Sequence, residues 1–164
     1  MLSQSRKYRT QWMSTFFAAG ELTRRGYLVT ITHGNATFVD LLVQSPSGES
    51  FSVDVKGMSA HNWIPVKKPD TINGYPHLEQ YYILVYAAQN LEDDEVPRYF
   101  IMSSREMYEE IIKGEEEAAQ INKNRLTEGK PELKEWAKNG IAFKQAEKYK
   151  NMWETLPGYY QLQK

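Results

Sequence analysis

The sequence predicts one small α/β domain in which a mixed central sheet of about five strands is flanked by helices. Its 164 residues are the usual size of a single domain. The hydrophobic patterns run in the order helix, five strands, then helices, with no internal repeat and no low-complexity linker. We therefore expect residues 1–164 to form one domain, with a core at about 8–112 and a C-terminal helical extension at 113–164.

The composition narrows the class of protein. Hydrophobic residues make up 41% and charged residues 25% of the chain, as in an average globular protein. There is no cysteine, which excludes a disulfide framework, a thiolate zinc site and a cysteine nucleophile. No stretch approaches the roughly 18 apolar residues of a membrane span, so we expect a cytoplasmic protein without a membrane partner. The net charge of -1 means that any contact with nucleic acid must be local.

The first predicted element is an amphipathic helix over residues 6–25. Its apolar positions recur every three or four residues, at Tyr8, Trp12, Phe16 and Ala19. This spacing predicts a stripe buried against the rest of the domain. Gly26 stands where helices commonly end, and Arg24 and Arg25 suit the negative end of the helix dipole. We therefore interpret the two arginines as structural rather than as phosphate ligands.

Five strands are predicted after this helix, at residues 27–32, 38–43, 51–56, 81–88 and 98–102. Short turns separate the first three, which indicates adjacent antiparallel strands. The third alternates strictly, which places Asp54 and Lys56 on one face and Phe51, Val53 and Val55 on the other. The continuous apolar run at 81–88 is typical of a central buried strand.

The connections and the remaining helices follow from turn residues and caps. Residues 57–76 are rich in Gly, Pro, Asn and His, which predicts a long irregular loop, and such loops are often functional. Ser103 and Glu106 have the spacing of a capping box, which predicts a helix through Ile112. Further helices are expected at 115–126, 131–138 and 144–156.

Two aspartates occur in strand-like segments, where carboxylates are depleted and costly to bury unpaired. Asp40 lies in the second predicted strand and Asp54 in the third. The two can converge if these strands pair through the turn between them, and Lys56 then lies on the face of Asp54. Two converging carboxylates suit Mg²⁺ or Mn²⁺, which can stabilise a phosphodiester transition state and lower the pKa of an attacking water. A nearby lysine can hold that water or the phosphate oxygens.

The pattern resembles the PD-(D/E)xK superfamily of restriction enzymes and Holliday-junction resolvases, and its small bacterial members in particular. The similar segments are ELTRRGY at 21–27, VDLLV at 39–43, VDVK at 53–56, and the runs at 81–86 and 98–104, so the resemblance covers about residues 8–112. It implies a restriction-endonuclease-like fold and a magnesium-dependent endonuclease acting on DNA, often as a homodimer. Asp40 and Asp54 would be the metal ligands, and Lys56 the catalytic lysine.

The first helix departs from this family pattern. Many members carry a glutamate in the middle of that helix, where this chain has Thr15. Glu21 lies six residues further on, about 240° around the helix, and cannot simply replace it. A second hypothesis is therefore a catalytically weak or inactive nuclease-fold domain that binds nucleic acid or a partner protein. A third is an enzyme of a different class that uses the same face.

Candidate substrate contacts lie in the loop after the third strand. Lys67 and Lys68 could reach a DNA backbone from there. His61 follows Lys56 by five residues and is a candidate for a supporting contact to the substrate. The three histidines are far apart and lack metal-ligand spacing, so we do not expect a zinc site. The sequence does not distinguish DNA from RNA, or a restriction role from repair or defence.

Overall fold

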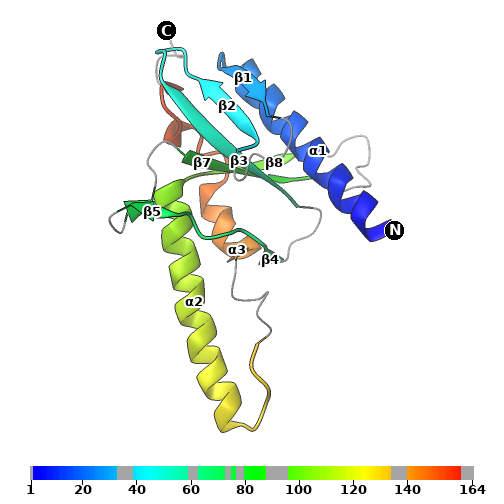
Figure 1. Ribbon diagram of the computed structural model, residues 1–164, viewed down its shortest axis with the longest axis vertical. Coiled ribbons are helices and arrows are strands. Elements are labelled where there is room, and N and C mark those ends of the chain that lie inside the picture. The colour runs from blue at the N-terminus through cyan, green and yellow to red at the C-terminus, as the bar shows by residue number, and fades with distance from the viewer. Residues whose placement is uncertain are drawn as a thin grey trace.

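The computed structural model describes residues 2–32, 39–58, 63–72, 75–76, 80–87, 96–133 and 140–159. It confirms the predicted α/β class, since a mixed five-stranded sheet lies between helices (Figure 1). The strands follow one another across this sheet in the order β1-β2-β3-β7-β8. Their bounds are Leu28–Ile31 for β1, Leu41–Gln44 for β2, Ser50–Met58 for β3, Gln80–Tyr86 for β7 and Arg98–Ser103 for β8.

The pairing of the strands agrees with the sequence patterns. β1, β2 and β3 are antiparallel neighbours, as predicted. β7 is the expected central strand, because it pairs in parallel with β3 and antiparallel with β8, and Ile83, Leu84 and Val85 are fully buried. The crossover from β3 to β7 contains no helix in its described residues. It contains the two-residue strands β4 (Trp63–Ile64), β5 (Thr71–Ile72) and β6 (Tyr75–Pro76).

Each face of the sheet has its own hydrophobic cluster. Helix α1 (Leu2–Arg24) covers one face, where Ala18 and Leu22 pack with Phe51, Val53 and Val55. The opposite face carries Tyr82, Leu84 and Phe100, packed against Met107 and Ile111 of helix α2. The predicted alternation along the third strand is thus confirmed, with Asp54 on the α2 side of the sheet.

The predicted buried stripe of α1 is wrong for its three aromatic residues, whereas Ala19 is partly buried against the core. Tyr8, Trp12 and Phe16 are exposed by 58%, 40% and 58%. The side chains that α1 buries are small ones or lie near its C-terminal end: Thr10, Ser14, Thr15, Ala18 and Leu22. The reason is a close approach to β3, since a Cβ atom on Gly57 would lie 2.5 Å from Ser14 Oγ and 2.8 Å from the Thr10 carbonyl oxygen. Bulky aromatic side chains cannot fit at that contact.

Helix α2 (Ser104–Thr127) is continuous, whereas the sequence predicted two helices. The predicted capping box is confirmed, because Ser103 Oγ accepts from the Glu106 amide and the Glu106 carboxylate accepts from the Ser103 amide. Gly114 lies inside the helix without breaking it, and it is buried there. A Cβ atom added to Gly114 would lie 3.8 Å from the Gly140 carbonyl oxygen. The C-terminal half of α2 extends away from the sheet (Figure 1).

The predicted last helix, 144–156, is broken into short pieces. These are helix α3 (Phe143–Ala146) and the 3₁₀ turns η2 (Glu147–Tyr149) and η3 (Trp153–Thr155), preceded by strand β9 (Ile141–Ala142), which pairs with β4. Asn151 has a positive φ of 57° and donates its N–H to the Tyr99 carbonyl, so the chain turns onto the edge of β8 instead of continuing as a helix. This segment adds Phe143 and Tyr149 to one hydrophobic cluster and Trp153 to the other.

Residues 131–133 are not helical, and the rest of the helix predicted at 131–138 lies outside the described residues. Among the helices that the structure describes, none combines the length and the apolar character that crossing a membrane requires.

Candidate active site

Asp40 is held at the entrance to β2 by an irregularity in strand pairing. Its N–H donates to the Val53 carbonyl over 3.0 Å, although Val53 is already the partner of Leu41. Two residues facing one is the arrangement of a β-bulge, which re-aims side chains and is common beside active sites. Here the Asp40 carboxylate turns onto β3, where Oδ2 accepts from the Val55 N–H over 2.8 Å. The carboxylate is therefore fixed next to Asp54 in the chain of β3.

Asp54 is a buried carboxylate in the middle of the sheet, with 2% of its surface exposed. Burial raises its pKa to about 6, because the charged form loses its hydration. The ammonium of Lys56 lowers this pKa, and the negative charge of Asp40 raises it. The influence of Asp40 shows that the two carboxylates are close enough to interact. The structure thus brings Asp40, Asp54 and Lys56 together.

Lys56 only partly compensates the buried charge. Its Nζ lies 2.6 Å from Asp54 Oδ1, and its side chain is 31% exposed. The ammonium lowers the pKa of Asp54 through its charge and a hydrogen bond, but burial raises this pKa more. The ionised carboxylate therefore keeps a net cost in the folded protein. A divalent cation beside it would reduce that cost.

Two further residues at this site were not found from the sequence. Tyr82 is the β7 partner of Asp54 and is buried on the same side of the sheet. Burial raises the pKa of Tyr82, and the charges of Asp54 and then Asp70 raise it further. The run at 81–88 predicted a buried strand, but nothing in it indicated which residue would lie beside Asp54. Asp70 lies in the segment predicted as a loop, and no sequence pattern marked it as a residue of the site.

Two of the three predicted substrate contacts, Lys67 and Lys68, lie beside carboxylates of this chain. Lys67 lies 3.5 Å from a carboxylate oxygen of Asp70. Lys68 binds both carboxylate oxygens of Glu115 on α2, each at 2.9 Å. Both lysines therefore already neutralise a carboxylate of this chain. His61 lies outside the described residues.

The residues of α1 that the sequence singled out have structural partners. Thr15 is buried, and its hydroxyl donates to the Gln11 carbonyl one turn earlier. Arg24 and Arg25 both bind the Glu21 carboxylate, and Arg25 also lies over the Trp153 ring, 4.1 Å from its centroid. These contacts agree with the structural interpretation of the arginines.

The donor set fits a hard divalent cation in number and type. The described residues contain no cluster of three or more His, Asp or Glu side chains that could hold a metal ion. Mg²⁺ is commonly held by only one or two carboxylates, with waters and substrate phosphates as the other ligands. Asp40 and Asp54 supply that minimum, although the Val55 N–H and the Lys56 ammonium already contact their oxygens.

Comparisons of the chain with protein-family models, with curated proteins and with solved structures found no match. The case for a function therefore depends on the site itself.

Proposed function

We propose that this protein is a metal-dependent nuclease that hydrolyses phosphodiester bonds in DNA, with Mg²⁺ or Mn²⁺ as its cofactor. The observation that supports this most is the pair of carboxylates on β3. Asp40 is fixed to the strand backbone by the Val55 N–H, and Asp54 beside it is buried with a raised pKa. Lys56 next to them supplies an ammonium group that can act on the attacking water or on a phosphate oxygen. The resemblance to PD-(D/E)xK enzymes assigns the same three residues.

Each residue has a definite role in this proposal. Asp40 and Asp54 would hold the cation, which when bound supplies charge stabilisation and a water of lowered pKa. Lys56 would leave Asp54 Oδ1 and donate to the attacking water or to a phosphate oxygen. Its side chain is 31% exposed, so it can reach a substrate from the sheet surface. Tyr82 would act as a positioning residue, because it is the buried strand partner of Asp54.

Two observations favour the second candidate, an inactive nuclease-fold domain that binds nucleic acid or a partner protein. The hydroxyl of Thr15, which stands where related enzymes carry a glutamate, is engaged within its own helix. Lys56 also already lies against the Asp54 oxygen that a metal would use. In this reading the lysine takes the place of the cation permanently.

Cleavage assays separate the two candidates. The purified protein is incubated with linear, circular and branched DNA, with Mg²⁺, with Mn²⁺ and with EDTA. We expect metal-dependent cleavage, and a fall of about 10² to 10³ in rate for Lys56→Ala, because a transition-state contact is lost. Asp54→Asn should lose both cleavage and metal binding. Lys130→Ala is the matched control, since Lys130 is an exposed lysine paired with Glu128.

Equal rates for the parent and Lys56→Ala would assign any cleavage to a contaminant or another site. The inactive-domain proposal would then be preferred. A cytoplasmic location and a homodimer, in which two sites could cut both strands of a duplex, belong to the same proposal. Sedimentation equilibrium tests the dimer directly.

A further inference from the structure

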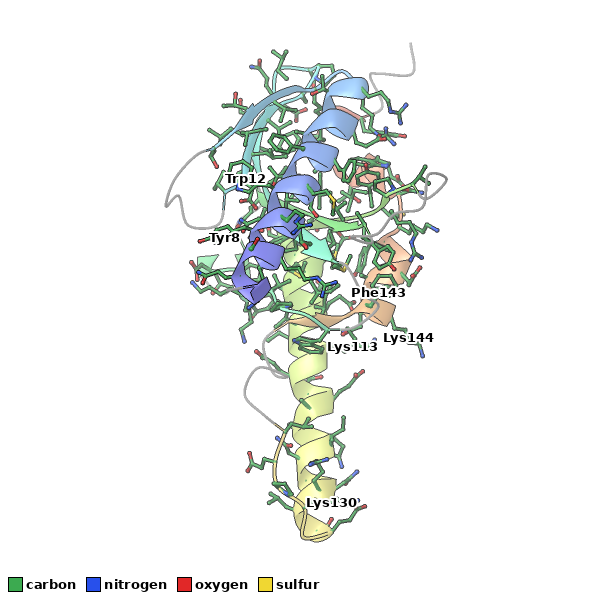
Figure 2. The ribbon with its side chains drawn as sticks, turned by 90° about the vertical axis from the view of Figure 1, so that its right-hand side faces the viewer. Tyr8, Trp12, Lys113, Lys130, Phe143 and Lys144 are labelled. Carbon is green, nitrogen blue, oxygen red and sulfur yellow. The ribbon has the colours of Figure 1, made fainter. Side chains whose placement is uncertain are left out.

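Three aromatic side chains form a line on the outer surface of α1. Tyr8, Trp12 and Phe16 are four residues apart, so they lie on one side of the helix. They are exposed by 58%, 40% and 58%, and the rings of Trp12 and Phe16 stack with centroids 5.7 Å apart. Figure 2 shows Tyr8 and Trp12 one turn apart along the helix. We call Tyr8, Trp12 and Phe16 the aromatic stripe.

The fold leaves this stripe outside for a structural reason. The sheet-facing side of α1 is set by the close contact of Thr10 and Ser14 with Gly57, so the aromatic residues must point elsewhere. Burying a large apolar side chain is worth about 1.5–3 kcal/mol. A row of three that is left exposed is the kind of surface that marks an interaction site.

The part of α1 that carries the aromatic stripe is itself positively charged. Arg6, Lys7 and Arg9 are exposed on the first turns of α1, and no acidic residue occurs from Leu2 to Gly20. Arg9 lies three residues before Trp12, which places the two side chains next to each other on the helix surface. The molecule as a whole has a net charge of -1, so this positive charge is local. A partner for this surface should be anionic and should carry flat apolar groups.

We infer that the aromatic stripe binds single-stranded nucleic acid, with bases stacked on Tyr8, Trp12 and Phe16 and phosphates near Lys7 and Arg9. Aromatic platforms beside basic residues are how proteins hold single strands without reading their sequence. The rings of Trp12 and Phe16 already stack on each other with centroids 5.7 Å apart, so a base stacks on an outer face of this ring pair or on Tyr8 and not between the two rings. Bases in a duplex are covered on both faces by their neighbours. A single strand can turn its bases outward onto these rings.

Two other occupants fit less well. A second copy of the chain would bring Lys7 and Arg9 of the two helices together, and the sequence of α1 has no carboxylate from Leu2 to Gly20 to offset their charge. An anionic membrane surface would match the charge, but membrane binding scales with the apolar area that is buried, and the stripe offers three side chains. The opposite side of α1 is packed on the sheet and cannot add to that area. Both occupants are outcomes of the test below.

The stripe and the acidic pair lie on different sides of the sheet. Helix α1 packs on one face, where Thr10 and Ser14 contact Gly57. Asp54 lies on the opposite face, beside its strand partner Tyr82. The inference relies on the proposed function only in naming nucleic acid as the ligand. Binding to the stripe needs neither the metal nor cleavage.

The test is fluorescence anisotropy in EDTA, with a labelled 15-nucleotide thymidine oligomer and a labelled duplex of the same length. Each of Tyr8→Ala, Trp12→Ala and Phe16→Ala should weaken binding of the single strand by roughly 5- to 150-fold. Lys7→Gln with Arg9→Gln should also reduce the salt dependence of binding by about 1.4 in the log–log slope. Ile121→Ala and Leu126→Ala, two exposed apolar residues of α2, are the matched controls and should bind like the parent.

The outcomes separate this inference from the proposed function. Because the assay contains EDTA, the parent should bind the single strand whether or not the protein cleaves DNA. Normal binding in the three aromatic variants, or an equal loss for the duplex, would overturn the inference even if the protein cuts DNA. The inference is also overturned if the aromatic variants lose binding to anionic phosphatidylserine vesicles but keep binding to the oligomer. Loss of a dimer in these variants, measured by sedimentation, would overturn it as well. Because the three side chains are exposed, the variants should keep the parent's unfolding midpoint, which circular dichroism checks.

Discussion

Replacing Asp54 by Asn should stabilise the metal-free protein above pH 6. The pKa of Asp54 is raised from 3.8 to about 6, mainly by burial, so the folded state binds this proton more tightly than the unfolded chain does. The associated stabilisation is complete below pH 4 and is lost as the pH rises through 6. At 1.36 kcal/mol per pH unit, ionised Asp54 costs the folded state about 3 kcal/mol at neutral pH. Asn has the same shape and carries no charge, so it avoids this cost.

Urea unfolding of parent and variant at pH 4, 5, 6, 7 and 8, in EDTA, measures the effect. The variant should be more stable by up to about 3 kcal/mol at pH 7–8, and the difference should become smaller towards pH 4, where Asp54 of the folded parent is protonated. Leu42→Asn is the control: this exposed side chain on the neighbouring strand does not titrate, so its difference from the parent should not change in this way. A stability difference for Asp54→Asn that is constant from pH 4 to 8 would refute the assignment of Asp54 as a buried carboxylate with a raised pKa.

Three further predictions concern packing, charge and the C-terminal segment. Gly57→Ala should destabilise the fold by about 1–3 kcal/mol in thermal unfolding, since its Cβ would overlap α1. Gly20→Ala, which meets nothing within 4 Å, should instead stabilise it slightly, and equal effects would contradict the close contact. Glu115→Gln should release Lys68 and tighten DNA binding with a steeper salt slope, whereas unchanged binding would remove Lys68 from the DNA surface. Glu110 is buried, which raises its pKa, but hydrogen bonds from α3 and η2 lower it more, so the net pKa is lowered. Glu110→Gln should therefore cost about 1–3 kcal/mol at pH 7, with the gap from the parent closing as the pH falls below 4.5, and a gap that persists there would argue against an ionised Glu110.

The fold class was predictable because its signals are local. The period-two alternation in β3, the apolar run of β7 and the cap at Ser103 each depend on a few neighbouring residues. The continuity of α2 was less predictable, because a glycine inside a helix is a weak breaker and tertiary packing can override it. The broken C-terminal helix depends on the pairing of Asn151 with Tyr99, which no local pattern reveals.

The orientation of α1 shows a different limit. The aromatic residues at 8, 12 and 16 have helical spacing, and such a stripe is normally buried. Which side of a helix faces a sheet also depends on how closely the backbones approach. Here Gly57 of β3 allows the contact with Ser14, and that pairing involves residues more than forty positions apart. The same contact leaves the aromatic residues outside.

The candidate site also combines contacts that local sequence patterns predict with contacts between distant segments that they do not predict. Asp40 and Asp54 are joined by a single turn between antiparallel strands, so their meeting could be inferred from the sequence. Tyr82 reaches Asp54 through a parallel pairing across a long crossover, and the register of such a pairing is not encoded locally. Asp70 lies within that crossover, as do the two lysines whose partners were not foreseen.

In the proposed nuclease, Lys56 and a divalent cation would compete for the same oxygen of Asp54, and this competition would distinguish an enzyme from a binding domain. The ion pair is partly exposed, at 31% for the lysine, so it is worth about 1 kcal/mol rather than the large energy of a buried pair. A cation held by two carboxylates should displace the ammonium, which is then close enough to act on the substrate. Removing the lysine removes the competitor, so Lys56→Ala should bind Mn²⁺ about fivefold more tightly than the parent at pH 8 while cleaving more slowly. Calorimetric titration in the absence of DNA measures the affinity, with Lys130→Ala as the control. Weaker Mn²⁺ binding in Lys56→Ala would mean that the lysine supports the metal site instead of occupying it. That result would refute the proposed competition between Lys56 and the cation.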